Sequence, residues 1–431
     1  MSSHPWRLWG RLREQLWFKP AWWSVVATFV ALAAVLANGV LPDGVLPDVE
    51  RQTLQGLLTI IASSMLTVST FSLSILVQAF SSAAGSATPR ALRVIMGDDN
   101  AQTAVATFIA AFIYAVIALL ALGLGYYGST GRFVLLLVTI AVVVQVIVML
   151  IRWIRTLSQL GRMGHTVQQV EAAASAALRD HWRDPALGGR ALETVHGLPG
   201  MPLRAVATGY VQHLDVPAMQ TQAQAQQWEI RLVLRPGAFV VRGQVLAMVA
   251  DAQGRAAVLA PEQEAALRRA IEVGAERSFL QDPRFGLLVL SEIGQRALSA
   301  AVNDAGSAIQ VGGSITRVLV DAWAQHRAGP PSDPPSADRC DRVYVPALDD
   351  ADFVRDAFAP LQRDAAGLVE VHTRFTKLLG AIAGATGGVL AEEARRLAWR
   401  GWLLAREQTV LEEERDALQR LARQASGRAA Q

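Results

Sequence analysis

Four long apolar stretches lie in the first part of the chain, at about residues 21–41, 53–80, 103–127 and 133–154. Each is long enough to cross a hydrocarbon core of about 30 Å as an α-helix. Such a stretch has to be helical in lipid, because every backbone N–H must find its hydrogen-bond partner within the segment. The pattern therefore predicts a four-helix transmembrane domain over residues 20–155.

Basic residues are unequally distributed among the segments that flank these stretches. Most of them lie in three segments: before the first stretch, between the second and third, and after the fourth. These residues are Arg7, Arg11, Arg13, Lys19, Arg90, Arg93, Arg152, Arg155 and Arg162. The opposite segments hold only Arg51 and Arg132. Because basic flanking residues stay on the cytoplasmic side, we expect both termini of this multi-pass protein in the cytoplasm.

Residues 1–19 form a separate N-terminal segment. Trp6, Trp9, Leu12, Leu16 and Trp17 recur at helical spacing with arginines between them. This pattern favours a short helix lying in the membrane interface. A disordered basic tail that only sets the topology is the alternative.

The second stretch carries a polar stripe. Its members recur at steps of four, three, four, four and three, which places them on one side of a helix: Ser63, Thr67, Thr70, Ser74, Gln78 and Ser81. One interpretation is helix packing, since small polar residues allow close approach and hydrogen bonds between helices. The other is a water-filled path that the hydroxyl groups line around an oligomer axis. These six residues are the pore-lining candidates.

The interiors of the four stretches lack Asp, Glu, Lys, Arg and His. Ionisable residues inside a membrane commonly mark proton relays and ion-coupling sites. Their absence favours a passive conduit for an ion or small solute over a charge-coupled pump.

The rest of the chain reads as a cytoplasmic α+β region. A connecting helix and a turn-rich linker are expected over residues 156–202, a small β unit over 203–260 and a helical domain over 261–425. In the β unit, Ile230, Leu232 and Leu234 alternate with arginines, as in a half-buried strand. A single last helix is expected over about residues 392–424.

The helical domain contains the densest motif of this region. Asp282-Pro283 has the form of an N-cap followed by proline at the first helical position. Glu292 and Arg296 are four residues apart, in the favourable order for an ion pair on a helix. Asn303-Asp304 then precedes and caps the next helix. A structural network of caps and pairs is the preferred interpretation, with a catalytic site as the alternative.

Composition excludes several classes of function. The 431 residues are 52% hydrophobic and 18% charged, with a mean hydropathy of +0.27, which is too apolar for an ordinary soluble protein. A net charge of +3 gives no support for a nucleic-acid partner. Cys340 is the only cysteine, and none of the seven histidines has metal-ligand spacing, so we expect no metal, no cofactor and no enzymatic activity.

Two groups of residues carry a family resemblance. The first comprises Ser86 to Arg90, with Pro89 and Arg90 at its end, followed by Asp99 and Gln102; the second comprises Asp282-Pro283, Phe285-Gly286, Arg296 to Ser299 and Asn303-Asp304. Together they resemble an uncharacterised bacterial membrane-protein family, domain of unknown function 2254. Thr88 and Ala300 stand where that family more often has Ser and Pro. The resemblance implies a location in the bacterial inner membrane and no established reaction.

The preferred hypothesis is a homo-oligomeric passive channel in the lipid bilayer, with the second stretch lining the path and the cytoplasmic region regulating it. The alternative is a membrane-anchored scaffold or sensor whose cytoplasmic domain binds a partner or small ligand. The fold class expected in either case is an α-helical membrane protein with four transmembrane helices and a cytoplasmic α+β C-terminal domain.

Overall fold

The computed structural model describes residues 18–36, 47, 49–86, 88–91, 99–157, 162–329, 340–365 and 367–428. The chain divides into two compact units, Met1–Thr166 and Val167–Gln431. Most of the expected interfacial helix at residues 1–19 lies outside the described residues, and so do residues 37–41 of the first predicted span.

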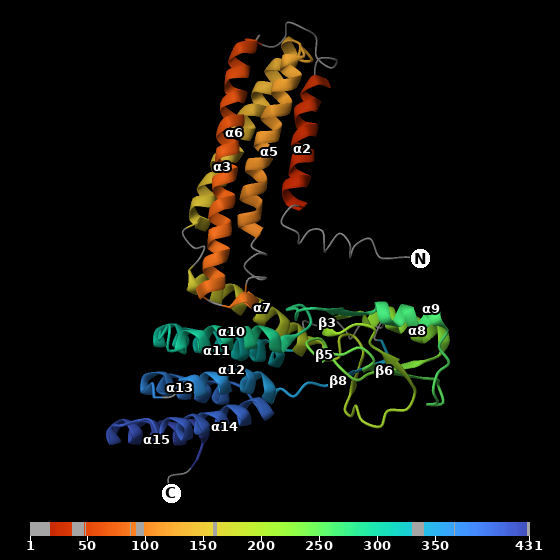
Figure 1. Ribbon diagram of the computed structural model, residues 1–431, viewed down its shortest axis with the longest axis vertical. Helices are drawn as coiled ribbons and strands as arrows, with labels where there is room; N and C mark the ends of the chain where they lie inside the picture. The colour runs from red at the N-terminus through yellow and green to blue at the C-terminus, as the bar shows by residue number, and fades with distance from the viewer. Residues whose placement is uncertain are drawn as a thin grey trace. The chain divides into compact units, whose positions relative to one another are not determined.

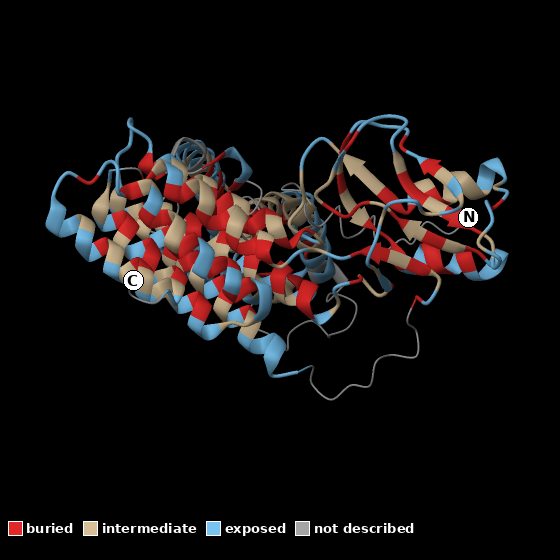
Figure 2. Ribbon diagram, turned by 90° about the horizontal axis from the view of Figure 1, so that it is seen from below, coloured by how far each residue is buried: buried red, intermediate tan, exposed pale blue. Residues whose placement is uncertain are grey.

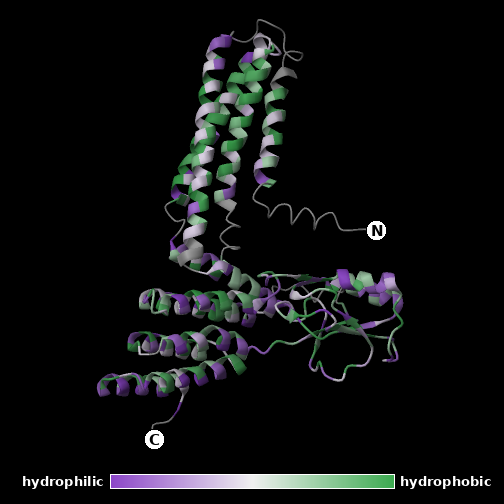
Figure 3. Ribbon diagram, in the orientation of Figure 1, coloured by the Kyte–Doolittle hydropathy of each residue, from purple (hydrophilic) through white to green (hydrophobic). Residues whose placement is uncertain are grey.

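The N-terminal unit consists of apolar helices (Figure 1). They are α2 (Phe18–Leu36), α3 (Arg51–Ser86), α5 (Asp99–Gly123) and α6 (Ser129–Leu157), with a short 3-10 turn, η2 (Pro89–Ala91), after α3. By length and composition, α3, α5 and α6 can each cross a membrane, whereas the described apolar part of α2 is shorter. Figure 3 shows hydrophobic residues along most of α5 and α6. The second, third and fourth predicted spans thus have matching helices, whereas the first, which falls in α2, stays a prediction.

Helix α5 is the core of this unit. It packs against α2, α3 and α6. In the most apolar 18-residue stretch of each helix, 56% of the residues are buried in α5, compared with 28% in α3 and 22% in α6. Small residues such as Ala104, Ala111 and Ala118 lie buried along it and let the neighbouring helices approach closely. The Tyr114 hydroxyl on α5 also lies 3.0 Å from the Thr139 hydroxyl on α6. The outer faces of α3 and α6 are consequently left uncovered within the unit.

The helical subdomain of the C-terminal unit is a stack of helix pairs. In Figure 1 the pairs α10/α11, α12/α13 and α14/α15 form successive tiers, and α7 packs with the first of them. The bounds are α7 (Met163–Arg183), α10 (Pro283–Leu298), α11 (Ala305–Arg327), α12 (Ala351–Asp364), α13 (Val369–Ala385), α14 (Gly388–Ala405) and α15 (Glu412–Ser426). Figure 2 shows buried residues along the helices of this stack.

The β subdomain contains two sheets and two helices. A five-stranded sheet has the order β1-β8-β4-β6-β2, and a three-stranded sheet has the order β5-β3-β7. Strand β8 is parallel to both β1 and β4, and the other pairs are antiparallel. The bounds are β1 (Arg190–Leu192), β2 (Met201–Arg204), β3 (Gly209–Leu214), α8 (Val216–Gln226), β4 (Glu229–Leu232), β5 (Phe239–Val240), β6 (Val245–Ala250), α9 (Pro261–Arg269), β7 (Ile271–Gly274) and β8 (Val343–Pro346).

The β region is larger than the expected 203–260. Strands β1, β7 and β8 lie outside that range, and β8 follows the helical segment α10–α11 in sequence. Strand β8 pairs with strands that are distant in sequence, and the local pattern of polar and apolar residues carries no information about such partners. Within the expected range the alternation holds, since Ile230, Leu232 and Leu234 are buried.

The single helix expected over about residues 392–424 is wrong. Two helices, α14 and α15, occupy this stretch and are separated by residues 406–411. The buried Thr409 hydroxyl donates to the Ala405 carbonyl, and the Arg415 guanidinium donates to the Thr409 carbonyl. The Thr409 amide also donates to the Ala405 carbonyl, at 3.0 Å, so these side-chain bonds reinforce the turn that ends α14.

Candidate functional site

The polar stripe of α3 lies on the side of the helix that faces away from α5. All six of its members are exposed in the unit: Ser63, Thr67, Thr70, Ser74, Gln78 and Ser81. The residues that α3 buries are Leu54, Leu58, Ile61, Met65, Ser69, Ser72 and Leu76. At 3.6 residues per turn, the centres of these two sets lie roughly 180° apart around the helix. The six sequence candidates therefore share one face, and that face is not part of the protomer's own core.

Hydroxyl groups along the stripe donate to the backbone of α3 itself. Thr67 donates to the Ser63 carbonyl at 3.0 Å, and Ser74 donates to the Thr70 carbonyl at 2.9 Å. Ser63 and Thr70 make the same bond one turn back. This pairing lets the hydroxyl groups lie in an apolar environment while their oxygen atoms keep the capacity to accept a hydrogen bond.

Apolar side chains flank the stripe on both sides. Large exposed residues of α3 comprise Leu57, Ile60, Leu66, Phe71, Leu73 and Val77. On a helical wheel, Ile60 and Phe71 fall on one shoulder of the stripe, and Leu66, Leu73 and Val77 fall on the other. The small polar residues of the seam allow another helix to approach closely, whereas the apolar shoulders suit contact with lipid and with helices alike.

The arginines at one end of this unit act as backbone donors. Arg51, at the start of α3, donates to the Gly123 carbonyl at the end of α5 at 2.8 Å. Arg132, near the start of α6, donates to the Val49 carbonyl at 2.9 Å. Both side chains bond carbonyl groups that have no helical partner at a helix end or in a loop. They close this end of the bundle.

The first family motif follows α3. Pro89 and Arg90 lie exposed in η2, and the Arg90 amide lies 3.4 Å from the hydroxyl of the buried Thr88. Asp99 begins α5, and its side chain lies outside the described part of the chain. Thr88 therefore keeps a hydroxyl group next to the turn.

In the second motif, Asp282 lies at the N-cap position of α10 and Pro283 follows it, as predicted, and the Asp282 side chain also forms an ion pair. The Arg277 guanidinium donates to both Asp282 carboxylate oxygens, at 2.7 and 2.9 Å. Burial raises the pKa of Asp282 even though Arg277 opposes the shift. A Cβ at Gly237, in the turn after β4, would collide with this carboxylate. The pair therefore fixes a corner between the β subdomain and α10.

The other residues of the second motif surround the α10–α11 turn. The Asp304 carboxylate caps α11 by accepting from the Ser307 amide at 2.9 Å, which confirms the predicted cap. Asn303 has a left-handed φ of 49°. Glu292 is half-buried and Arg296 is exposed on α10, one turn apart, and their ion pair stays a prediction. The turn from residue 299 to residue 304 is exposed throughout.

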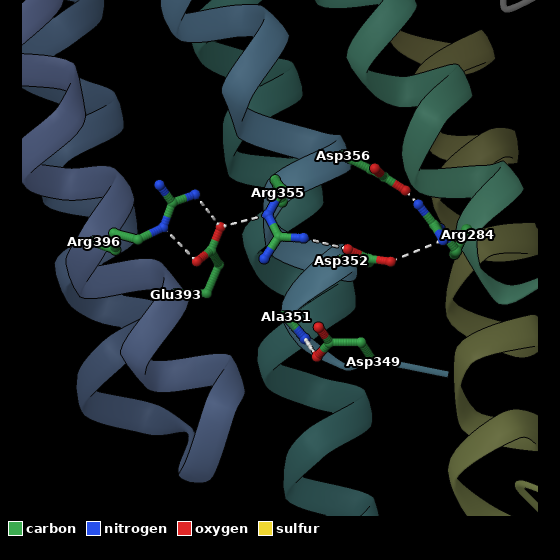
Figure 4. A network of polar contacts seen from close by, with 8 residues as sticks. All are labelled: Arg284, Asp349, Ala351, Asp352, Arg355, Asp356, Glu393 and Arg396. Carbon is green, nitrogen blue, oxygen red and sulfur yellow. Dashed lines mark hydrogen bonds and ion pairs between the residues drawn. The ribbon is translucent and has the colours of Figure 1, made fainter. Parts of the chain in front are cut away.

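A polar network that sequence patterns did not indicate joins three helices of the stack (Figure 4). Arg284 of α10 bonds Asp352 and Asp356 of α12, at 2.9 and 2.7 Å. On the other side of α12, Glu393 of α14 accepts from Arg355 and from Arg396. The sequence shows that Asp352, Arg355 and Asp356 lie about one helical turn apart, but it does not show which residues of other helices they pair with.

Arg235 is a buried cation, whereas the alternation of Ile230, Leu232 and Leu234 with the residues between them predicts an exposed side chain at this position. Only 6% of its surface is exposed, and its Nη1 donates to the Pro185 and Pro346 carbonyls, at 2.8 and 2.6 Å. Burial lowers its pKa to about 10, an effect that Asp184 and Asp282 partly oppose. No group of three or more His, Cys, Asp or Glu residues able to hold a metal lies within the described parts of the chain.

Comparison with known proteins gives one family. The family described as Predicted membrane protein (DUF2254) matches residues 13–381. Uncharacterized proteins of Mycobacterium bovis and of Mycobacterium tuberculosis are each 26% identical to the chain over 350 residues, covering 76% of this chain and 63% of the relative. The chain thus spans less than two thirds of the length of these relatives. No solved structure matches it. Because the family matches most of its length, the chain belongs to this family of predicted membrane proteins.

Proposed function

We propose that this membrane protein assembles from several identical copies and forms a passive path for an ion or small solute, with the polar stripe of α3 facing the path. In this proposal the protein lies in the bacterial inner membrane with both termini in the cytoplasm. The C-terminal unit then lies on the cytoplasmic side, where it regulates the path.

The observation that carries the proposal is the exposure of the whole stripe. A protomer alone in lipid would present Gln78 and five hydroxyl-bearing residues to hydrocarbon chains. The hydroxyl groups reduce this cost through their backbone bonds, but the Gln78 amide has four hydrogen-bonding positions to satisfy. Copies arranged around an axis give these groups water, while the shoulders of α3 pack against neighbouring copies.

Flux through reconstituted liposomes tests the proposal. Thr70→Phe and Ser74→Leu place bulk on the stripe, and we expect each to reduce the flux of small ions and solutes at least about tenfold. Ala141→Leu adds comparable bulk at an exposed position of α6 and serves as the control, with flux unchanged. Equal flux through the control and both stripe variants would overturn the path.

A second candidate function is a self-associating membrane scaffold or sensor whose C-terminal unit binds a partner or small ligand. The hydroxyl bonds to the α3 backbone favour it, because they make the stripe compatible with a dry contact between helices. Crosslinking of cysteines placed at Thr67 and Ser74 separates the candidates. Efficient crosslinking between copies without any flux supports the scaffold, whereas flux with solvent-accessible cysteines supports the path.

A further inference from the structure

The helical and β subdomains of the C-terminal unit are joined by four crossing segments. They connect α7 to β1, β7 to α10, α11 to β8 and β8 to α12. Arg235 lies in the turn between β4 and β5, and this turn touches three of them. Its Nη1 donates to Pro185 in the first crossing segment and to Pro346, the last residue of β8, where the fourth segment begins. Gly237 of the same turn lies against Asp282 in the second.

The contact that Arg235 makes is incomplete. Its Nε and Nη2 atoms are buried and have no hydrogen-bond partner among the described residues, and the same is true of Nδ1 of His181 at the end of α7. Buried polar groups are ordinarily hydrogen-bonded, and a partly satisfied network is less stable than a complete one. Separation of the subdomains would give these atoms water.

The first crossing segment is also strained. Leu187 has a φ of 54°, in the left-handed region that is costly for a residue with a branched side chain, and Gly188 follows with a φ of 85°. The Leu187 amide donates to the Asp184 carbonyl, and the Gly188 carbonyl accepts from the Cys340 amide. Strain of this kind persists only where the surroundings hold the backbone in place.

We propose that Arg235 is a latch that holds the β subdomain against the helical subdomain, and that the two subdomains separate locally when it is released. The closed state has two hydrogen bonds from Nη1 in its favour, against the unsatisfied buried atoms and the strained crossing. Its opening therefore requires less free energy than global unfolding of the unit.

Hydrogen exchange of the full chain in lipid nanodiscs tests the latch. Arg235→Met removes the donor and keeps apolar bulk. We expect exchange in peptides covering residues 184–192 and 340–350 to become at least about tenfold faster, because two hydrogen bonds across the crossings are lost. Exchange in α13 and α14 should stay as in the wild type. Arg235→Lys retains a donor and should restore most of the protection.

Arg255→Met is the control. Arg255 lies in the β subdomain and its side chain bonds Asp251 and Gln253, neither of which lies in a crossing segment, so exchange at the crossings should not change. Two results would overturn the latch: unchanged crossings in Arg235→Met, or equal acceleration in α13 and α14, which would make Arg235 an ordinary core residue. If Arg235→Met does not fold, the wild type decides. Crossing segments that exchange as slowly as α13 would then also overturn it.

Discussion

Gly286 of α10 lies directly against Ala174 of α7: a Cβ added at Gly286 would stand 2.5 Å from the Ala174 Cβ and 2.6 Å from its Cα. This distance leaves no room for a methyl group, so the two helix backbones cross at closest approach here. Arg317 of α11 adds a two-pronged ion pair to Glu171 on the same face of α7, with both distances 2.7 Å. The glycine of the family motif is therefore explained by helix packing.

Gly286→Ala should destabilise the C-terminal unit by about 2 to 4 kcal/mol, because α7 has to move away from α10. Thermal or denaturant unfolding of the purified protein measures the loss. Gly313→Ala on α11 is the control, since its new Cβ would meet only Arg317 Nη1, at 3.8 Å. That change should leave stability equal or raise it by up to about 1 kcal/mol, as alanine favours a helix. Equal losses in both variants would contradict the close crossing.

His372 of α13 makes stability depend on pH. The ring is 1% exposed, neither nitrogen has a hydrogen-bond partner in the described residues, and burial lowers its pKa to about 4. Between pH 6.5 and about 4 the unfolded chain binds a proton that the folded state excludes, so the free energy of unfolding falls as pH falls. Below about pH 4 this loss is complete.

Between pH 7.5 and pH 5.0, we expect the free energy of unfolding to fall less in His372→Leu than in the wild type, by on the order of 2 kcal/mol. Denaturant unfolding at the two pH values gives the difference. His196→Gln, at an exposed histidine, should follow the wild type. A His372→Leu variant with the wild-type pH dependence would contradict the assignment.

Glu393 is the shared acceptor at one end of the network in Figure 4. Its side chain is 6% exposed; burial by itself would raise its pKa, but hydrogen bonds from Arg396 and Arg355 outweigh this and hold the pKa below its usual value. Glu393→Gln should destabilise the stack by about 1 to 2 kcal/mol at neutral pH, because Arg355 and Arg396 lose this carboxylate and Arg355 keeps only its pair with Asp352. Glu392→Gln, at the exposed neighbouring position, should change stability by less than about 0.5 kcal/mol. Thermal unfolding compares the two variants, and similar small effects would sink the idea that Glu393 joins α12 to α14.

Tyr114 and Thr139 should respond unequally to loss of their mutual contact. The Thr139 hydroxyl also lies 2.7 Å from the Leu135 carbonyl, so Tyr114→Phe leaves it with a partner and should cost about 1 kcal/mol or less. Thr139→Val leaves the buried tyrosine hydroxyl with only a 3.5 Å contact to that carbonyl and should cost more. Unfolding in bicelles measures the stability of both variants. A larger loss in Tyr114→Phe than in Thr139→Val would contradict the idea that the Tyr114 hydroxyl depends on Thr139 more than Thr139 depends on Tyr114.

Local sequence rules predicted the features that depend on neighbouring residues. The spacing of Thr70 and Ser74 placed them on one helix face, and the residue types at Asp282 and Asp304 located the starts of α10 and α11. The same rules could not tell which face of α3 packs on α5, because both faces carry hydroxyl groups: the stripe on one and the buried Ser69 on the other. That distinction follows from the apolar residues that alternate with Ser69 and Ser72 on the opposite face.

Features that depend on tertiary contact were outside the reach of these rules. Arg235 continues a polar-apolar alternation that should place it in solvent, yet the carbonyl groups of Pro185 and Pro346 surround its Nη1. These residues are 50 and 111 positions away in the chain. The one available sign was the Pro236-Gly237 turn, which follows the arginine directly in the sequence, whereas β4 itself ends at Leu232.

Helix α3 is longer than a membrane is thick. Its 36 residues extend about 54 Å at 1.5 Å per residue, against a hydrocarbon core of about 30 Å. Such a helix tilts in the bilayer or projects from it, and its tilt changes when the bilayer becomes thinner or thicker. In the assembly that we propose, the angle at which neighbouring copies of α3 present their hydroxyl groups to one another would therefore depend on bilayer thickness, which would act as a mechanical input.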